Sequence, residues 1–235
     1  RDFIGDAIKA GAAAIVTGMA PVTKDIAKLT QQAAIPILQC ENPRRIMAKM
    51  AAVNWLSQPG MVAAVTGTNG KTSTTEFLRQ LWQRATWQAI AVGTLGITGT
   101  DMIKSDGALL SLPSLTTPDS ISLHATLAPL TKAGVTHLAL EASSHGLEQH
   151  RLDGLNIHIA AFTNLSRDHL DHHVDMERYF AAKHRLFTDL LSEGGAAIIN
   201  LDDRHSAAII DSLQDRHIVI KTFGYAQDAD FRILS

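Results

Sequence analysis

The segment Val62–Thr75 carries the residue types and spacing of a phosphate-binding loop. An apolar run leads into two glycines, Gly67 and Gly70, and Lys71 follows the second one directly. Glycines allow tight turns, so the amides of the loop and of the next helix can point at phosphate oxygens. The lysine adds a cation for the phosphates, and the Thr72 hydroxyl suits a Mg²⁺ shell. We therefore predict nucleotide-phosphate binding here, in preference to a plain glycine turn.

The glycine spacing of this loop departs from the general P-loop pattern. In G-x-x-x-x-G-K-[ST] the first position is a glycine. Here Val65 occupies that position, and the first glycine comes two residues later at Gly67. The tighter spacing indicates a distinct subgroup of phosphate-binding loops.

A carboxylate ends one of the predicted apolar strands. Glu141 follows Thr-His-Leu-Ala-Leu and precedes the small-residue loop Ala-Ser-Ser-His-Gly. A carboxylate that emerges from an apolar strand needs a cation. The alternatives are an ion pair with a neighbouring arginine and a helix cap.

Further side chains of metal-ligand type crowd into one short segment after a predicted strand. The segment Asn164–His173 holds Asp168, His169, Asp171, His172 and His173. Metal binding is one interpretation of this group. A loop this short cannot aim every side chain at one ion, so a solvated surface position is at least as favoured for any single histidine.

Lys183 lies on the apolar face of a predicted helix. Tyr179 and Phe180 precede it by four and three residues, and Leu186 and Phe187 follow it by three and four. Such spacing places all five side chains on one face. Burial of a lysine lowers its pKa and yields a neutral amine, whereas a side chain that reaches out to solvent is the commoner outcome.

Two other polar segments suit ligand contacts or simple structural roles. The sequence Thr116-Thr117-Pro118-Asp119 predicts a turn in which Asp119 or Ser120 caps the next helix. The loop sequence Gln149-His150-Arg151 offers amide and guanidinium donors. Arg151 suits a forked pair with a carboxylate or phosphate, and a surface ion pair is the alternative.

These residues are expected to meet at one edge of a doubly wound, mostly parallel α/β sheet. Beyond the glycine loop we expect strands at Ala89–Gly93, His137–Glu141, Ile157–Thr163, Ala196–Asn200 and Ile218–Phe223, with helices over Ser120–Ala133 and Met176–Leu191. Strands separated by helices indicate this fold class. Ligands of such sheets bind beyond the C-terminal ends of the strands, where Gly67, Glu141 and Asn164 are expected.

The N-terminal part predicts a smaller, partial α/β domain. We expect helices over Asp6–Ala10 and Lys24–Gln31 and strands near Ala12–Thr17 and Ile35–Gln39. Pro43 then opens a helix with one buried stripe formed by Ile46, Met47, Met50, Val53 and Leu56. Ser57-Gln58-Pro59-Gly60 ends that helix. We therefore expect an N-terminal domain over 1–56, a linker over 57–60 and a central nucleotide-binding domain over 61–235.

The composition is that of a globular protein. Of 235 residues 46% are hydrophobic and 19% are charged. No apolar run approaches the roughly 18 residues that span a bilayer, and we expect neither a membrane segment nor a secretory signal. A formal net charge of -2 gives no general attraction to nucleic acid. Cys40 is the only cysteine, which excludes an internal disulfide and fits a reducing compartment.

In order and spacing, these motifs together resemble the Mur ligase family. The matching segments are Thr66–Thr74, Thr116-Thr117-Pro118, Glu141–Leu147, Gln149–Arg151, Thr163–His173 and Lys183. The resemblance covers most of the chain and is greatest to the branch that adds the third peptide residue, diaminopimelate or lysine. It implies a cytoplasmic, monomeric, Mg²⁺-dependent ligase of peptidoglycan precursor synthesis. Such an enzyme uses ATP to join a diamino acid, meso-diaminopimelate first of all, to UDP-MurNAc-L-Ala-D-Glu through an acyl phosphate.

The resemblance also implies a role for each matched residue. The ATP phosphates would be surrounded by Gly67, Thr68, Asn69, Gly70, Lys71, Thr72 and Ser73, with Lys71 on the β and γ oxygens and Thr72 on one Mg²⁺. Glu141 and His169 would bind a second metal ion. Lys183 would be carbamylated and so become an anion that supports Mg²⁺; with Lys71, Glu141 and His169 it would form the catalytic group. The UDP-muramoyl dipeptide would be held by Thr116, Thr117, Ser143, Gln149 and Arg151.

The chain departs from the complete family pattern. Leu115 stands where some members have an asparagine before the two threonines, and no Asp-Asn-Pro-Arg motif occurs. We expect a fragment, inactive by itself, that lacks the C-terminal domain and the uridine-binding start of the N-terminal domain. The alternatives are another Mur ligase, a folylpolyglutamate or cyanophycin synthetase, a nucleotide-binding module without ligase activity, and a transition-metal protein built on Asp168–His173.

Overall fold

The chain divides into two compact units, Arg1–Met47 and Ala48–Ser235. The computed structural model describes residues 3–102, 115–166 and 175–234. The segment 168–173, which includes His169, lies outside these residues. The division between the units falls inside a helix and ahead of the linker expected at 57–60.

The first unit is a small α/β fold. Its elements alternate in the order α1 (Ile4–Lys9), β1 (Ile15–Thr17), α2 (Lys24–Gln32) and β2 (Ile37–Gln39). The two strands pair in parallel, with Ile15 opposite Ile37. The predicted order of helices and strands is confirmed, and both strands are shorter than expected.

The helix α3 (Pro43–Asn54) corrects the predicted buried stripe. All five apolar residues of that stripe are between 36% and 83% exposed, namely Ile46, Met47, Met50, Val53 and Leu56. The buried residues of α3 are instead Ala48 and Ala51. A Cβ atom added to Gly154 would lie 2.6 Å from the Ala48 carbonyl oxygen, so the two backbones nearly touch. Close packing of small residues therefore decides which face is buried.

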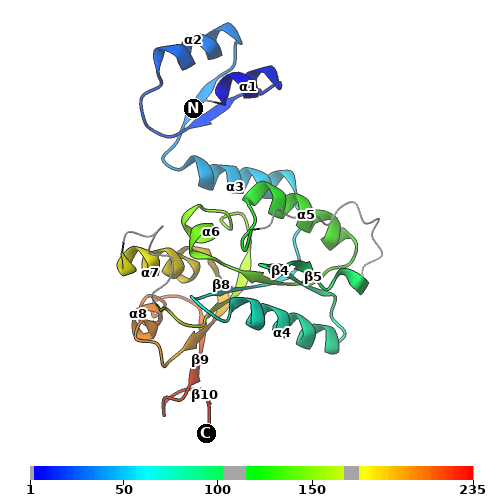
Figure 1. Cartoon of the computed structure of the whole chain (residues 1–235), viewed down its shortest axis with the longest axis vertical. Helices are drawn as coiled ribbons and strands as arrows, with labels where there is room; N and C mark the ends of the chain where they lie inside the picture. The colour runs from blue at the N-terminus through cyan, green and yellow to red at the C-terminus, as the bar shows by residue number, and fades with distance from the viewer. Residues whose placement is uncertain (1–2, 103–114, 167–174, 235) are drawn as a thin grey trace. The chain divides into compact units, whose positions relative to one another are not determined.

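The second unit is built on an eight-stranded sheet (Figure 1). Its strands are β3 (Met61–Thr66), β4 (Ala89–Gly93), β5 (Gly96–Thr98), β6 (His137–Glu141), β7 (Ile157–Phe162), β8 (Leu191–Asn200), β9 (Val219–Gly224) and β10 (Phe231–Arg232). Their order across the sheet is β10-β9-β8-β7-β3-β6-β4-β5. Among the described pairs only β4 and β5 run antiparallel. The predicted doubly wound, mostly parallel α/β fold is confirmed.

Helices cover both faces of this sheet. In Figure 1, α5 (Ser120–Lys132) and α6 (Ser144–Glu148) lie on one side and α4 (Lys71–Arg84) on the other. The predicted helix at 176–191 is α7 (Met176–Arg185) followed by a π-helical turn over Leu186–Leu190. Both α6 and α8 (Ser206–Asp211) are too short for a periodic pattern, and they were not predicted. No helix in the described part of the chain is both long and apolar enough to cross a membrane.

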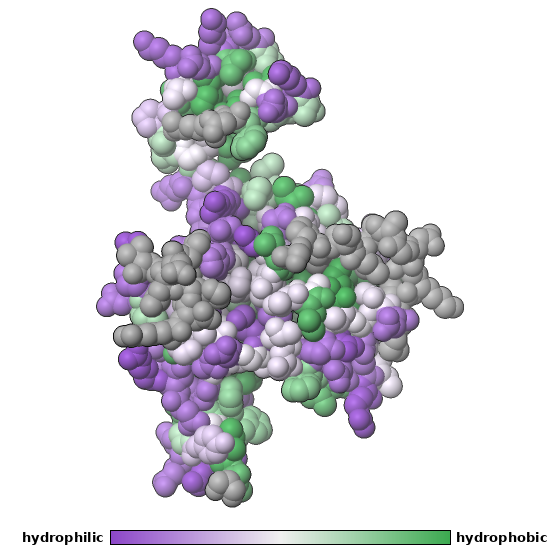
Figure 2. Space-filling view, in the orientation of Figure 1, coloured by the Kyte–Doolittle hydropathy of each residue, from purple (hydrophilic) through white to green (hydrophobic). Residues whose placement is uncertain are grey.

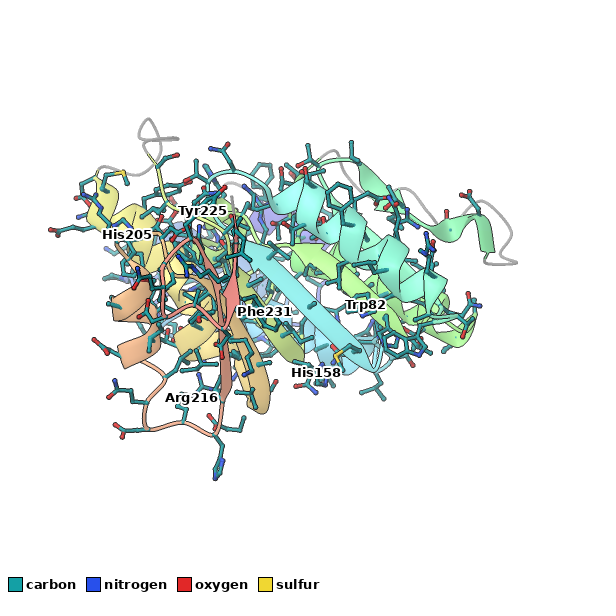
Figure 3. All side chains as sticks on the ribbon, turned by 90° about the horizontal axis from the view of Figure 1, so that it is seen from below. Trp82, His158, His205, Arg216, Tyr225 and Phe231 are labelled. Carbon is teal, nitrogen blue, oxygen red and sulfur yellow. The ribbon has the colours of Figure 1, made fainter. Side chains whose placement is uncertain are left out.

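The central strands are buried on both faces. β4 is buried along its whole length, and β3 and β6 are buried at every residue after the first. Strands covered on two sides have continuous apolar sequences, which is why their bounds could be predicted closely. On the α4 side, Trp82 packs against small strand residues such as Ala63 and Ala139, and Figure 3 labels it beside α4. In Figure 2, hydrophobic and hydrophilic residues lie side by side over α4.

β8 begins five residues earlier than the predicted strand at 196–200. Its first half contains Gly194 and Gly195, residues that usually interrupt a strand. The strand continues through these glycines because its pairing with β7 shifts in register between Ile157 and Ile159, as at a β-bulge. A Cβ on Gly195 would lie 2.7 Å from the His158 carbonyl oxygen, so glycine is required for this close approach.

Candidate functional site

The predicted glycine loop connects the end of β3 at Thr66 to the start of α4 at Lys71. Gly70 forms the N-cap of α4 with a φ angle of +84°, which favours glycine. Gly67 has a φ angle of +149°, and a Cβ atom there would overlap the Thr163 hydroxyl. The loop therefore has the strand-to-helix geometry that the sequence predicts.

The loop is held in shape by the residues that follow β7. The Thr68 amide donates to the Asn164 carbonyl oxygen at 2.9 Å, and the Asn69 amide donates to Asn164 Oδ1 at 3.0 Å. Thr163 Oγ1 donates to the Asn69 carbonyl oxygen at 2.6 Å. These two loop amides thus fix the loop itself and do not point away from it toward a ligand. The sequence indicated only that Asn164 follows a strand, because its contact with the loop depends on β7 lying beside β3.

Two lysines meet at one backbone oxygen of this loop. Lys71 Nζ donates to the carbonyl oxygens of Gly67 and Thr68, each at 2.9 Å. Lys183 Nζ, from α7, donates to the same Gly67 oxygen at 2.8 Å. Two amine groups that share one acceptor create a site that favours an anion.

Lys183 is buried, and its side chain does not reach out to solvent. It is 2% exposed, and its Nζ lies 4.5 Å from the centre of the Tyr179 ring, within the range of a cation–π contact. The Tyr179 and Thr68 hydroxyls are hydrogen-bonded at 3.2 Å. Leu186 and Phe187 are fully buried behind them. The apolar face predicted for this helix is therefore packed against the unit and carries Lys183 to the glycine loop.

Glu141 lies at the end of β6, beside β3, and is 1% exposed. Its Oε1 accepts a hydrogen bond from the Thr94 amide at 2.9 Å, and Thr94 Oγ1 donates to Oε2 at 3.3 Å. Among the described residues, the Glu141 carboxylate is thus hydrogen-bonded to Thr94 and is not paired with an arginine. A Cβ atom at Gly93 would overlap the carboxylate, so glycine is needed there. Thr94 was not predicted, because the sequence marks it only by its place directly after a predicted strand.

A small pocket lies between the start of α4 and the Glu141 carboxylate. Its lining includes Thr72, Glu76, Gly93 and Glu141. Its volume is about 10 Å³, close to the smallest space that holds one water molecule. A hydrogen bond from Arg79 lowers the pKa of Glu76 from 4.5 to about 2, so this carboxylate is charged at neutral pH. Carboxylate and hydroxyl oxygens are the donors that Mg²⁺ prefers.

Thr117 is a buried junction in this region. Its Oγ1 donates to the Glu141 carbonyl oxygen at 2.7 Å and accepts from the Ser143 amide at 2.9 Å. Thr116 Oγ1 lies 3.1 Å from Thr94 Oγ1, which connects it to the carboxylate of Glu141. Thr116 and Thr117 therefore lie next to Glu141, although they are far from it in the sequence.

The other predicted substrate residues gather around Thr117. Arg151 Nη1 donates to the Thr117 carbonyl oxygen at 2.6 Å, and Arg151 Nη2 donates to Gln149 Oε1 at 2.9 Å. Ser143 Oγ accepts from the Gly146 amide at 3.1 Å and caps α6. Asp119 caps α5 by accepting from the Ser122 amide at 3.0 Å, as one alternative predicted. The structure thus joins Thr116, Thr117, Ser143, Gln149 and Arg151 in one network with Glu141, whereas His169 is outside the described residues.

Comparisons with known proteins agree on one family. Residues 65–234 match the profile described as the Mur ligase middle domain. The chain is 45% identical over 222 residues to UDP-N-acetylmuramoyl-L-alanyl-D-glutamate–2,6-diaminopimelate ligase of Brucella melitensis, covering 94% of this chain and 43% of that protein. The chain therefore spans less than half the length of this relative.

Solved structures give the same result. One, titled as a UDP-N-acetylmuramoyl-L-alanyl-D-glutamate–2,6-diaminopimelate ligase, has a TM-score of 0.73 and 32% identity, covering 94% of this chain and 48% of that one. A structure of FolC from E. coli in complex with ADP has a TM-score of 0.57 at 17% identity, covering 77% of this chain and 47% of that one. At that identity the second likeness concerns the fold alone.

Proposed function

The chain belongs to the Mur ligase family, and we propose that the full-length protein is an ATP-dependent ligase of peptidoglycan precursor synthesis. Its proposed reaction adds meso-diaminopimelate as the third residue of UDP-MurNAc-L-Ala-D-Glu. The observation that carries this proposal is the convergence of Lys71, Glu141 and Lys183 around the glycine loop. The names of the relatives at the higher identities support diaminopimelate over the folate-type substrates of the FolC branch.

The proposed reaction proceeds through an activated carboxylate. Direct attack of an amine on a carboxylate fails because the leaving group would be oxide. Instead, a γ-carboxylate oxygen of the D-glutamate attacks the γ-phosphorus of ATP, and the bond to ADP breaks. The amine then attacks the acyl carbon, so a carbon–nitrogen bond forms, phosphate leaves and the amine loses its proton. The products are the amide, ADP and phosphate.

The protein would contribute mainly by positioning and charge. Phosphoryl transfer requires little covalent chemistry from an enzyme, so fixed cations and amides at the phosphates provide most of the rate enhancement. We assign this role to Lys71 and to the segment Gly67–Ser73, which comprises the glycine loop and the first residues of α4. Lys71 donates hydrogen bonds to the Gly67 and Thr68 carbonyl oxygens, and these contacts keep its amine next to the loop.

Mur ligases use Mg²⁺ with ATP, and the residues around Glu141 fit such an ion. Thr72 and Glu141 line one pocket and offer hydroxyl and carboxylate oxygens. We propose Thr72 as a ligand of one Mg²⁺, and Glu141 and His169 as ligands of a second metal ion, with Lys183 in its modified form as a further ligand. When bound, these ions would neutralise charge on the transferring phosphoryl group.

For Lys183 we propose a carbamate. Its side chain is 2% exposed, and burial disfavours the charged ammonium form relative to a neutral amine, which can capture CO₂. Addition of CO₂ forms a nitrogen–carbon bond and releases a proton. The carbamate nitrogen keeps one N–H, so the hydrogen bond to the Gly67 carbonyl oxygen is compatible with the modification. The carbamate carries a negative charge, which attracts Mg²⁺.

The remaining assignments concern substrate binding and location. We propose that Thr116, Thr117, Ser143, Gln149 and Arg151 form the wall that holds the UDP-muramoyl dipeptide, with the domain at 1–56 contributing to the UDP part and the domain at 61–235 binding ATP. The network around Thr117 supports this grouping. We further propose that the protein acts in the cytoplasm as a monomer; its single cysteine, Cys40, fits a reducing compartment.

Product formation by the full-length protein tests the proposed function. With ATP, Mg²⁺ and UDP-MurNAc-L-Ala-D-Glu, we expect ligation of diaminopimelate and not of L-lysine. Lys183→Ala should lower turnover by about a hundredfold or more, because it removes a group at the phosphates. Added short-chain carboxylate should restore part of the activity.

Lys132→Ala provides a control, since Lys132 is an exposed lysine in the last turn of α5. Its turnover should equal that of the wild type. If no product forms with diaminopimelate and none forms with L-lysine, the proposed function is contradicted. Near-normal turnover of Lys183→Ala would contradict the carbamate alone.

A further inference from the structure

Arg185 connects α7 to α6 and to the turn that follows α6. Its Nη2 donates to both carboxylate oxygens of Asp153, at 2.7 and 2.9 Å. Its Nη1 donates to the Leu147 carbonyl oxygen near the end of α6, and its Nε donates to Asp189 Oδ2 at 2.8 Å. All three guanidinium nitrogens are therefore engaged, each with a different residue. Figure 1 shows α6 beside α7.

The Asp153 carboxylate is the buried centre of these contacts. Its side chain is 2% exposed, compared with 17% for Arg185. Its Oδ1 also lies 2.9 Å from His150 Nδ1. His150 has a φ angle of +57°, in the left-handed region that residues other than glycine seldom adopt. One carboxylate thus stabilises an unusual turn and attaches it to α7.

That turn carries two of the proposed substrate residues. Gln149 and Arg151 flank His150, and Arg151 reaches the carbonyl oxygen of Thr117 at 2.6 Å. Thr117 in turn bonds the Glu141 carbonyl oxygen at 2.7 Å. Hydrogen bonds, together with the turn itself and Thr117, therefore link α7 to the end of β6.

We propose that Arg185 is a positioning residue that, through Asp153, holds the turn 149–153 at a fixed place relative to Lys183 and the glycine loop. The inference rests on the proposed function. α7 bonds the glycine loop through Lys183 and the substrate turn through Arg185, so it sets the separation of the ATP site from the dipeptide site. Loss of the guanidinium removes a positive charge and two hydrogen bonds from the buried Asp153 carboxylate, and the turn should move.

Asp189 offers a matched control on the same arginine. Its side chain is 40% exposed, whereas that of Asp153 is 2% exposed. An exposed ion pair contributes little, so removal of the Asp189 charge should leave the turn in place. Asp189→Asn changes the charge next to α7 without removing the Arg185–Asp153 contact. Comparison with the Arg185 variants therefore separates a positioning role from a general effect of charge near α7.

The test compares Arg185→Met, Arg185→Lys and Asp189→Asn in the full-length protein. For Arg185→Met we expect the KM for UDP-MurNAc-L-Ala-D-Glu to rise about tenfold or more, with the KM for ATP within about twofold of the wild type. Arg185→Lys should restore part of the affinity, and Asp189→Asn should match the wild type. An equal rise of both KM values, or no change in either, would overturn the inference.

Amide hydrogen exchange on the same proteins decides the question without ligase activity. The Arg151 amide donates to the Gly146 carbonyl oxygen at 2.9 Å and reports on the turn, while the Thr68 amide reports on the glycine loop. Arg185→Met should accelerate exchange at Arg151 about tenfold or more and leave Thr68 unchanged, and Asp189→Asn should change neither. Unaltered exchange at Arg151 would overturn the positioning role. An inactive wild type would count only against the proposed function.

Discussion

Thr66 and Thr117 are both buried beside the candidate site, but their hydroxyls have opposite surroundings. Thr117 Oγ1 donates one hydrogen bond and accepts another. Thr66 Oγ1 has no hydrogen-bond partner among the described residues. A buried hydroxyl with two partners supports the structure, whereas one with none carries the cost of its lost hydration.

Replacement by valine should therefore affect the two positions differently. Thr117→Val leaves the Ser143 amide without its acceptor, and we expect a loss of about 1–3 kcal/mol in the free energy of unfolding. Thr66→Val should be neutral or slightly stabilising, since no hydrogen bond is lost. Urea unfolding of both variants of the 235-residue chain measures this difference. Equal losses would show that the hydroxyl contacts do not explain the stability of this region.

The place of the main site residues was predictable, whereas their partners were not. Glu141 ends an apolar strand in the sequence, and that position alone puts it at the ligand edge of a parallel sheet. Its contact with Thr94 depends on β4 lying next to β6, which no local pattern indicates. Burial of Lys183 likewise depends on what covers its helix face. Local residue types therefore predict which groups reach the edge, and tertiary packing decides what they contact.

Glu76 connects α4 to the antiparallel edge strand β5. Its carboxylate pairs with Arg79 on the same helix and accepts a hydrogen bond from Thr98 Oγ1 of β5 at 2.8 Å. Arg79 is the main cause of its low pKa of about 2. The ionised form of Glu76 is thus the one that the folded protein favours.

This pairing predicts a specific loss of stability in acid. The pKa is lower in the folded state than the usual 4.5, so Glu76 stabilises the fold above pH 4.5 and the effect is lost as the pH falls toward 2. Glu76→Gln should be less stable than the wild type at pH 7, and the difference should shrink between about pH 5 and pH 2. Arg79→Met should show the same convergence. Denaturant unfolding across this range measures it, and a difference that is constant with pH would refute the assignment.

Among the helices and strands, the buried central strands were predicted most closely. Their continuous apolar runs are a direct consequence of cover on both faces. The short elements β5, β10, α6 and α8 are too brief to show a period, and β8 contains a glycine pair that resembles a turn. In α3 the pattern was clear but the face was wrong, because alanines at the close contact with Gly154 outweigh larger apolar residues.

The topology of the whole sheet explains why distant segments form one site. β3 is flanked by β6 and β7, and the chain winds away from it in both directions. The ends of these three strands carry Gly67, Glu141 and Asn164, which are far apart in the sequence and adjacent at one edge of the sheet. α7 then adds Lys183 from the chain beyond β7. The doubly wound order that the sequence predicts thus accounts for the assembly of the candidate site.

The transfer of carboxylate oxygen to phosphate tests the proposed ligase most directly. UDP-MurNAc-L-Ala-D-Glu labelled with heavy oxygen in the γ-carboxylate of its D-glutamate is given to the full-length protein with Mg²⁺, ATP and diaminopimelate. Because that carboxylate attacks the γ-phosphorus and its oxygen stays on phosphorus when the amide forms, each phosphate released should carry one labelled oxygen. Ligation that releases unlabelled phosphate would contradict the acyl phosphate route, and phosphate release without ligation would contradict the ligase assignment itself.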